Sequence, residues 1–145
     1  MKKGENNIMI DHISFAVNNF EWSRDFYDQT LAILGYERLM NFDDGEHQVA
    51  GYGKNGKTAL WIGAKKKLSD EDKREHIGQA AGFHVGFAAS DVKSVRKWYT
   101  KCLELGATDN GAPGPRPEYH LAYYGGFIID PHGWRIEACF QNYQG

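Results

Sequence analysis

The sequence predicts an α+β domain in which two tandem βαβββ modules form a cupped mixed sheet. The first observation is an internal repeat, because shifting the chain by 72 residues lays residues 12–17 over residues 84–89. The second is a strand followed by a capped helix in each half, and the third is a set of short strands between turns. Six positions are identical between the copies, where chance gives about one: His12/His84, Phe15/Phe87, Ala16/Ala88, Arg24/Arg96, Tyr27/Tyr99 and Leu31/Leu103.

The first strand of module one is predicted over residues 10–17, where apolar and polar side chains alternate. Successive side chains of a strand point to opposite faces. One face therefore carries Ile13, Phe15 and Val17, and the other carries His12, Ser14 and Ala16.

A helix follows the first strand in each module. In module one, residues 18–19 supply the N-cap and Gly35 the left-handed stop, and in module two residues 90–91 and Gly106 take these places. Apolar side chains at helical spacing mark the first helix: Trp22, Phe26, Tyr27, Leu31 and Leu34.

Three short strands are predicted after each helix, at residues 36–42, 46–52 and 57–63, and then at about 107–110, 119–130 and 134–141. Gly, Asn, Asp and Pro in residues 43–45, 54–56 and 130–133 favour the turns between them. Module one then spans about residues 8–63 and module two about residues 81–142, in a single domain of 1–145. The polar stretch 64–80 is predicted to be a linker. The Pro- and Gly-rich residues 110–117 are predicted to be a stiff loop at the rim of a pocket.

Composition narrows the class of protein. Of 145 residues, 41% are hydrophobic and 25% are charged, which is typical of a folded domain. The net charge of -2 argues against nucleic acid and membrane surfaces as partners, and no stretch reaches the ~20 apolar residues that span a bilayer. Cys102 and Cys139 form no CxxC pair and are interpreted as core thiols. We expect a cytoplasmic protein.

The candidate chemistry lies in Glu137, which interrupts an apolar run, and in the repeated pair His12 and His84. A buried carboxylate needs a partner, because an unpaired charge costs several kcal/mol. If the two first strands lie side by side at the centre of a cleft, both imidazoles and the carboxylate converge. Two imidazoles and one carboxylate can hold a divalent ion on one side and leave positions open for substrate oxygens.

Motifs across nearly the whole chain resemble the vicinal oxygen chelate superfamily, which includes glyoxalase I, extradiol dioxygenases and bleomycin-resistance proteins. They are DHISFAV, RDFY and LGY in module one and GFHVGFAASD and DPHGWRIEACF in module two. The resemblance implies the glyoxalase/bleomycin resistance/dihydroxybiphenyl dioxygenase fold, with His12, His84 and Glu137 as ligands of a zinc, nickel, manganese or iron ion. It also implies a homodimer, in which exchanged modules would take His12 and His84 of one site from different chains.

Two departures bear on the type of chemistry. Glyoxalase I takes a fourth ligand from the last strand of module one, where this chain has Leu60 or Trp61, neither of which can ligate. Extradiol dioxygenases place an acid–base tyrosine ten residues before the metal-binding glutamate, and this chain has Phe127 there. The first departure disfavours strict glyoxalase I activity, and the second weakens a dioxygenase assignment.

The resulting prediction is a metal-dependent enzyme of the glyoxalase-like lyase, isomerase or dioxygenase type acting on a small substrate. His120 and Tyr124, expected on one face of a strand, are the candidate proton donors. Trp61 and Arg116 are the candidate substrate contacts. The alternative is a protein of the bleomycin-resistance type that binds or sequesters a small molecule without metal. The substrate, the ion and the oligomeric state stay open.

Overall fold

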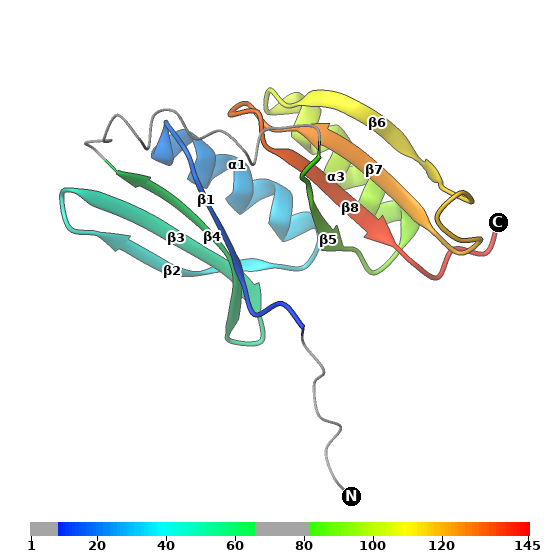
Figure 1. The fold of residues 1–145 in the computed structure, drawn as a ribbon, viewed down its shortest axis with the longest axis horizontal. Coiled ribbons are helices and arrows are strands. Elements are labelled where there is room, and N and C mark those ends of the chain that lie inside the picture. The colour runs from blue at the N-terminus through cyan, green and yellow to red at the C-terminus, as the bar shows by residue number, and fades with distance from the viewer. Residues whose placement is uncertain (1–8, 66–81) are drawn as a thin grey trace, which may run out of the picture.

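The computed structural model describes residues 9–65 and 82–145, which form two βαβββ modules (Figure 1). Module one contains β1 (Ile13–Ala16), α1 (Phe20–Ile33), β2 (Glu37–Asp43), β3 (His47–Lys54) and β4 (Lys57–Lys65). Module two contains β5 (Val85–Ala88), α3 (Val92–Glu104), β6 (Thr108–Pro115), β7 (Tyr124–Ile129) and β8 (Arg135–Phe140). The predicted α+β class and its repeated module are confirmed.

Each module forms its own mixed four-stranded sheet. Sheet A has the order β1-β4-β3-β2 and sheet B the order β5-β8-β7-β6. The first strand of each module pairs in parallel with the last, and the other ladders are antiparallel. Within the described residues no ladder joins β1 to β5, so the expected central pair of first strands is not formed in one chain. No ladder between these strands therefore brings His12 and His84 together.

The helix ends follow the predicted chemistry. Asn19 caps α1 by accepting a 3.1 Å hydrogen bond from the backbone N–H of Trp22. Asp91 caps α3 in the same way through the N–H of Ser94, at 2.6 Å. Gly35 and Gly106 follow the helix ends with φ of 87° and 99°, a conformation that other residues adopt at a cost. Both helix boundaries are thus set by local sequence.

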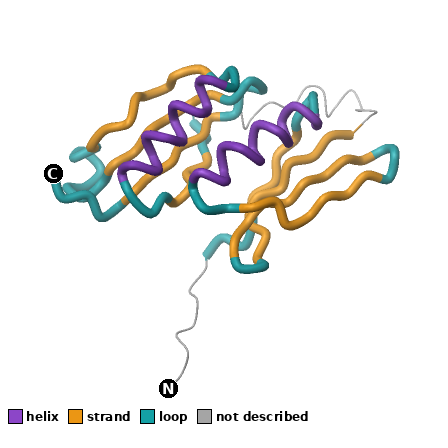
Figure 2. Tube along the Cα trace, turned by 180° about the vertical axis from the view of Figure 1, so that it is seen from behind, coloured by secondary structure: helices purple, strands orange, loops and turns teal. Residues whose placement is uncertain are grey.

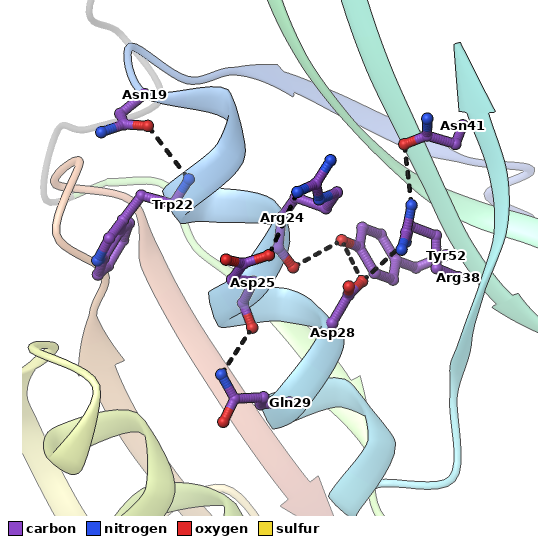
Figure 3. A network of polar contacts seen from close by, with 9 residues as sticks. All are labelled: Asn19, Trp22, Arg24, Asp25, Asp28, Gln29, Arg38, Asn41 and Tyr52. Carbon is purple, nitrogen blue, oxygen red and sulfur yellow. Dashed lines mark hydrogen bonds and ion pairs between the residues drawn. The ribbon is translucent and has the colours of Figure 1, made fainter.

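Polar contacts fix α1 to sheet A (Figure 3). The Tyr52 hydroxyl on β3 lies 3.0 Å from Asp28 Oδ1 and 3.1 Å from the carbonyl oxygen of Arg24, both on α1. Arg38 on β2 donates from Nε to the same Asp28 oxygen at 3.0 Å. Burial is the main cause of the raised pKa of Tyr52, and the adjacent Asp28 adds to it, so the phenol keeps its proton to donate.

Both helices lie on the same side of the molecule, each in front of its own sheet (Figure 2). Each sheet also has a face opposite its helix, here called the free face, which neither α1 nor α3 covers. On sheet A, Leu60 and Ile62 are in the core, so Trp61 between them lies on the free face. Met40 and Phe42 on β2 are 51% and 53% exposed. Module one therefore presents apolar side chains to solvent on its free face.

The strand boundaries differ from the prediction in three places. Strand β6 continues through Pro115, where a loop was expected, because it is an edge strand and needs no donor on its open side. Strand β7 begins only at Tyr124 rather than at residue 119. Strand β4 includes residues 64–65 of the predicted linker, and residues 66–80 lie outside the described residues.

The modules are joined near the turn before β8. The indole Nε1–H of Trp134 donates to the carbonyl oxygen of Ala16 at 2.8 Å, and its ring stacks on Phe15 with centroids 4.8 Å apart. Tyr36, just after α1, donates to the carbonyl oxygen of Ala88 on β5 at 2.7 Å. These contacts hold module two against the first strand and helix of module one.

Candidate functional site

Glu137 lies on β8, the strand of sheet B between β5 and β7, and only 2% of the residue is exposed. Its neighbours Ile136 and Ala138 are in the core, so Glu137 projects to the free face. Glycines on the adjacent strands leave room for its carboxylate. A Cβ atom at Gly125 would lie 2.8 Å from Oε2, and one at Gly86 would lie 3.3 Å from Oε1. The backbone thus forms a recess for one acidic side chain.

Two side chains bind the carboxylate, and with Glu137 they form what is here called the Glu137 cluster. His84 Nε2 lies 3.1 Å from Oε1 of Glu137. The Tyr123 hydroxyl donates to Oε2 at 2.5 Å. Burial, reinforced by the hydrogen bond to Glu137, raises the pKa of Tyr123, so this phenol remains protonated and donates. The partner that a buried carboxylate requires is supplied from two directions.

The cluster is open on the side of His84, whose side chain is 53% exposed. Phe127 pairs with Glu137 in the β7–β8 ladder, and its ring meets the His84 ring edge to face, with centroids 6.0 Å apart. Arg116 lies over the Phe127 ring, 5.5 Å from its centroid, and donates to the carbonyl oxygen of Ala112 at 2.7 Å. A small molecule at His84 would therefore meet an aromatic ring and a nearby cation.

The two predicted proton donors lie in different environments. Tyr124 is 2% exposed, and its hydroxyl accepts from Arg96 Nε at 2.8 Å on the side of α3. His120 is exposed and packs against the Tyr123 ring with centroids 5.4 Å apart. The prediction that His120 and Tyr124 share a strand face is wrong, because β7 begins at Tyr124 and residue 120 lies in the preceding turn.

Tyr123 is the residue that sequence reasoning missed. Strand alternation continued back to His120 predicts its neighbour Tyr124 instead. The His120 imidazole accepts from the N–H of Ala122 at Nδ1 and lies 3.2 Å from Gln141 Oε1 at Nε2, so its neutral form carries the proton on Nε2. His120 reaches the Glu137 cluster only through the Tyr123 ring.

Module one holds the other two predicted site residues. Trp61 lies half-buried on the free face of sheet A over Gly51, where a Cβ would come within 2.7 Å of the indole. His12 precedes β1 and its Nδ1 lies 2.7 Å from Asp11, which also accepts from Lys57 at 2.8 Å. The His12 and Lys57 side chains hold the pKa of Asp11 below its usual range. Neither His12 nor Trp61 hydrogen-bonds or stacks with a residue of the Glu137 cluster.

The fit of a metal ion to these donors is partial. Two ligands at right angles on one ion, each about 2.1 Å from it, are separated by about 3 Å. The 3.1 Å between His84 Nε2 and Glu137 Oε1 matches that separation, and Tyr123 would hold the second carboxylate oxygen. Across residues 9–65 and 82–145, however, no group of three His, Cys, Asp or Glu side chains is close enough to hold an ion. The structure brings His84 and Glu137 together and leaves His12 apart.

Comparison with known proteins identifies the family. A model of the Glyoxalase/Bleomycin resistance protein/Dioxygenase superfamily matches residues 9–138. No curated protein sequence matches the chain.

Neither helix in the part of the chain that the structure describes has the length and apolar character that crossing a membrane requires.

Solved structures share the fold at low sequence identity. A glyoxalase/bleomycin resistance protein from Albidiferax ferrireducens has a TM-score of 0.69 and 23% identity, covering 91% of this chain and 98% of that one. A glyoxalase I mutant from Zea mays has a TM-score of 0.66 and 21% identity, covering 90% of this chain and 45% of that one. A glyoxylase/bleomycin resistance protein/dioxygenase domain from Frankia sp. EAN1pec has a TM-score of 0.63 and 15% identity, covering 91% of this chain and 96% of that one. At these identities, the similarities show a shared fold and do not show a shared activity.

Proposed function

Because this chain belongs to the glyoxalase, bleomycin-resistance protein and dioxygenase superfamily, we propose that it is a metal-dependent enzyme acting on a small substrate with two adjacent oxygen atoms. The observation that carries the proposal is the pairing of His84 Nε2 with a buried, otherwise apolar-flanked Glu137 at 3.1 Å. An imidazole and a carboxylate at this spacing are suited to a zinc, nickel, manganese or iron ion.

Each residue of the Glu137 cluster has a separate role in this proposal. His84 and Glu137 hold the ion, which would act as a Lewis acid toward substrate oxygens. Tyr123 fixes the carboxylate orientation and, with its raised pKa, does not give up its proton at neutral pH. His120 is exposed to solvent and its ring packs against Tyr123, so it is the candidate proton carrier beside the site.

The third ligand is proposed to be His12 of the partner subunit in a homodimer. Within one chain, the His12 imidazole is occupied by Asp11 and lies apart from the Glu137 cluster. The exposed Met40 and Phe42 on the free face of sheet A are apolar surface that a second subunit or a substrate would cover. In such a dimer, the free face of sheet A and the Glu137 cluster of the other subunit would enclose one site.

The proposed substrate lies between apolar and cationic groups. Phe127 beside His84 offers an aromatic surface, and Arg116 over Phe127 offers a positive charge for a carboxylate or phosphate. Trp61 on the free face of module one would contribute a second aromatic surface in the dimer. This arrangement favours a small anionic substrate with a planar or apolar part.

Metal content tests the ion. Protein purified without an affinity tag is analysed by elemental mass spectrometry, after incubation with manganese, nickel, zinc or iron and desalting. We expect wild type to retain close to one ion per chain and His84→Ala and Glu137→Ala to retain little. His47→Ala is the matched control, because this exposed imidazole is paired with Asp44 away from the cluster. Wild type that retains no ion contradicts the proposal.

Subunit mixing tests the shared site. His12→Ala and Glu137→Ala proteins, each defective alone, are unfolded together and refolded as a mixture. If each site takes His12 from one chain and Glu137 from the other, half of the dimers are mixed and each mixed dimer has one intact site, giving about one ion per four chains. No recovery in a preparation shown by light scattering to be dimeric contradicts a site shared between subunits.

The second candidate is a metal-free protein that binds a small planar molecule. It is favoured by the fact that both oxygens of Glu137 already have partners within the chain, so the cluster needs no ion for its stability. In that case His84 and Phe127 form a binding surface alone. The metal measurement separates the two candidates, since the binder retains no ion in any variant.

A further inference from the structure

A cavity lies between the two modules on the helix side of sheet A, and its lining includes Gly86, the glycine that lies against the Glu137 carboxylate. Its volume is about 410 Å³, within the range of small-molecule sites. It opens between the C-terminal part of α1, the β3–β4 turn and strand β5. His84, Glu137 and Tyr123 are not among its lining residues. The apolar part of the lining comes from both modules: Ile13, Leu31, Leu60, Val85 and Phe87.

The polar groups in the wall of this cavity are already paired. The Tyr36 hydroxyl donates to the carbonyl oxygen of Ala88 at 2.7 Å. The Tyr52 hydroxyl is held by Asp28 at 3.0 Å, as Figure 3 shows. Because these phenols face partners in the protein, the interior has little to offer a polar ligand and suits an apolar body.

The rim of the cavity carries an unbalanced positive charge. Lys57 is paired with Asp11 at 2.8 Å, and His12 occupies the other oxygen of that carboxylate. Lys54, across the β3–β4 turn, is exposed and has no ion-pair partner among the residues that the structure describes. An acidic group at the mouth of the cavity would therefore meet the Lys54 ammonium without displacing an existing pair.

We propose that this cavity binds a small amphipathic anion, an aromatic or short aliphatic body bearing one carboxylate or sulfonate. The body lies against Leu31, Leu60 and Phe87, and the acidic group lies at Lys54. The lining belongs to both modules, so a bound ligand would also bridge module one and β5. Of the proposed metal ligands, His12 is part of the cavity lining, whereas His84 and Glu137 are not. The tests below measure binding at Lys54 and at methyl groups rather than metal retention, so they can fail without the enzyme assignment failing.

Fluorescence titration with anilinonaphthalene sulfonate, an aromatic sulfonate of suitable size, tests whether the Lys54 charge contributes to binding. We expect saturable binding at one site per chain, and a Kd raised about fivefold in Lys54→Glu through loss and reversal of one exposed charge. The matched control is Lys97→Glu, an exposed lysine on α3 with the same change of net charge. Equal affinities in wild type and Lys54→Glu, or equal weakening in both variants, overturn the proposal.

Methyl NMR tests the location without altering the protein. Decanoate is added to protein labelled at Ile, Leu and Val methyl groups. Shifts are expected at Leu31, Leu60 and Val85, while Val95, a buried residue of α3 outside the lining, stays unchanged. Decylamine, with the same chain and the opposite charge, should shift these methyls far less at equal concentration. Shifts confined to other methyls, or equal effects of the two compounds, contradict the assignment.

Discussion

The hydroxyl of Tyr27 on α1 donates a 2.7 Å hydrogen bond to Oδ2 of Asp130, which lies in the turn before β8 of the other module. Both residues are buried, with 1% and 3% exposed. The second oxygen of Asp130 accepts from the backbone N–H groups of His132 and Trp134, at 2.9 Å each. One carboxylate therefore shapes the turn of module two and binds the helix of module one.

Tyr27→Phe should destabilise the protein by about 2 kcal/mol, because it leaves a buried carboxylate oxygen without its donor. Tyr99→Phe is the control, since Tyr99 occupies the equivalent helix position and donates to the exposed Asp109 at 2.8 Å. Urea unfolding followed by circular dichroism should show a clearly smaller loss for Tyr99→Phe. Equal losses would mean that the contact between modules adds nothing beyond an ordinary surface hydrogen bond.

The stability contributed by Asp130 should depend on pH. Burial raises the pKa of this carboxyl above its ordinary value of 3.8, against the lowering effect of the Tyr27 hydroxyl. The native state then binds the proton more tightly than the unfolded state, so the contribution is full below pH about 4 and falls as pH rises through the native pKa. The unfolding free energy of wild type minus that of Asp130→Asn should therefore decrease between pH 4 and pH 7.

Urea unfolding of both proteins at the two pH values measures this difference, and the other titrating groups cancel in the comparison. If wild type instead gains stability relative to Asp130→Asn as pH rises, the three hydrogen bonds outweigh burial. The native pKa of Asp130 would then lie below that of the unfolded chain.

The features that sequence predicted correctly are local or repeated. The helix caps at Asn19 and Asp91 and the glycine stops at Gly35 and Gly106 depend on residues within one turn of the chain. The duplicated module was predicted because six identities recur at one offset. The burial of Glu137 was predicted from its apolar neighbours, because a residue between core residues on one strand is buried along with them.

The features that sequence missed depend on how distant segments pack. Tyr123 and Tyr124 are adjacent, and only the partners Glu137 and Arg96 decide which tyrosine enters the site. The position of His12 relative to His84 depends on contacts between modules, such as Tyr36 with Ala88, that leave no pattern in either segment. The edge position of β6, which permits a strand through prolines, is likewise a property of the assembled sheet.

Gly125→Ala should disturb the Glu137 cluster more than a comparable change elsewhere. The new methyl would lie 2.8 Å from Glu137 Oε2 and 3.2 Å from the Tyr123 ring, so one of them must move. Gly63→Ala in β4 is the control, because its closest contact would be an ordinary 3.5 Å. We expect about 1–3 kcal/mol lower stability and reduced metal retention for Gly125→Ala. Similar values in the two variants would show that the carboxylate is not confined by its glycines.

The adjacent tyrosines give the sharpest test of the site. Tyr123→Phe removes the donor to Oε2 of Glu137 and should weaken metal affinity about 10- to 100-fold, as loss of a group that orients a ligand does. Tyr124→Phe removes an acceptor of Arg96 on the helix side and should cost stability while leaving metal affinity unchanged. Competition with a chromophoric chelator measures both affinities, and urea unfolding gives the two stabilities. A weaker affinity in Tyr124→Phe equal to that in Tyr123→Phe would show that the metal site responds to general loosening of β7, and the specific role of Tyr123 would be lost.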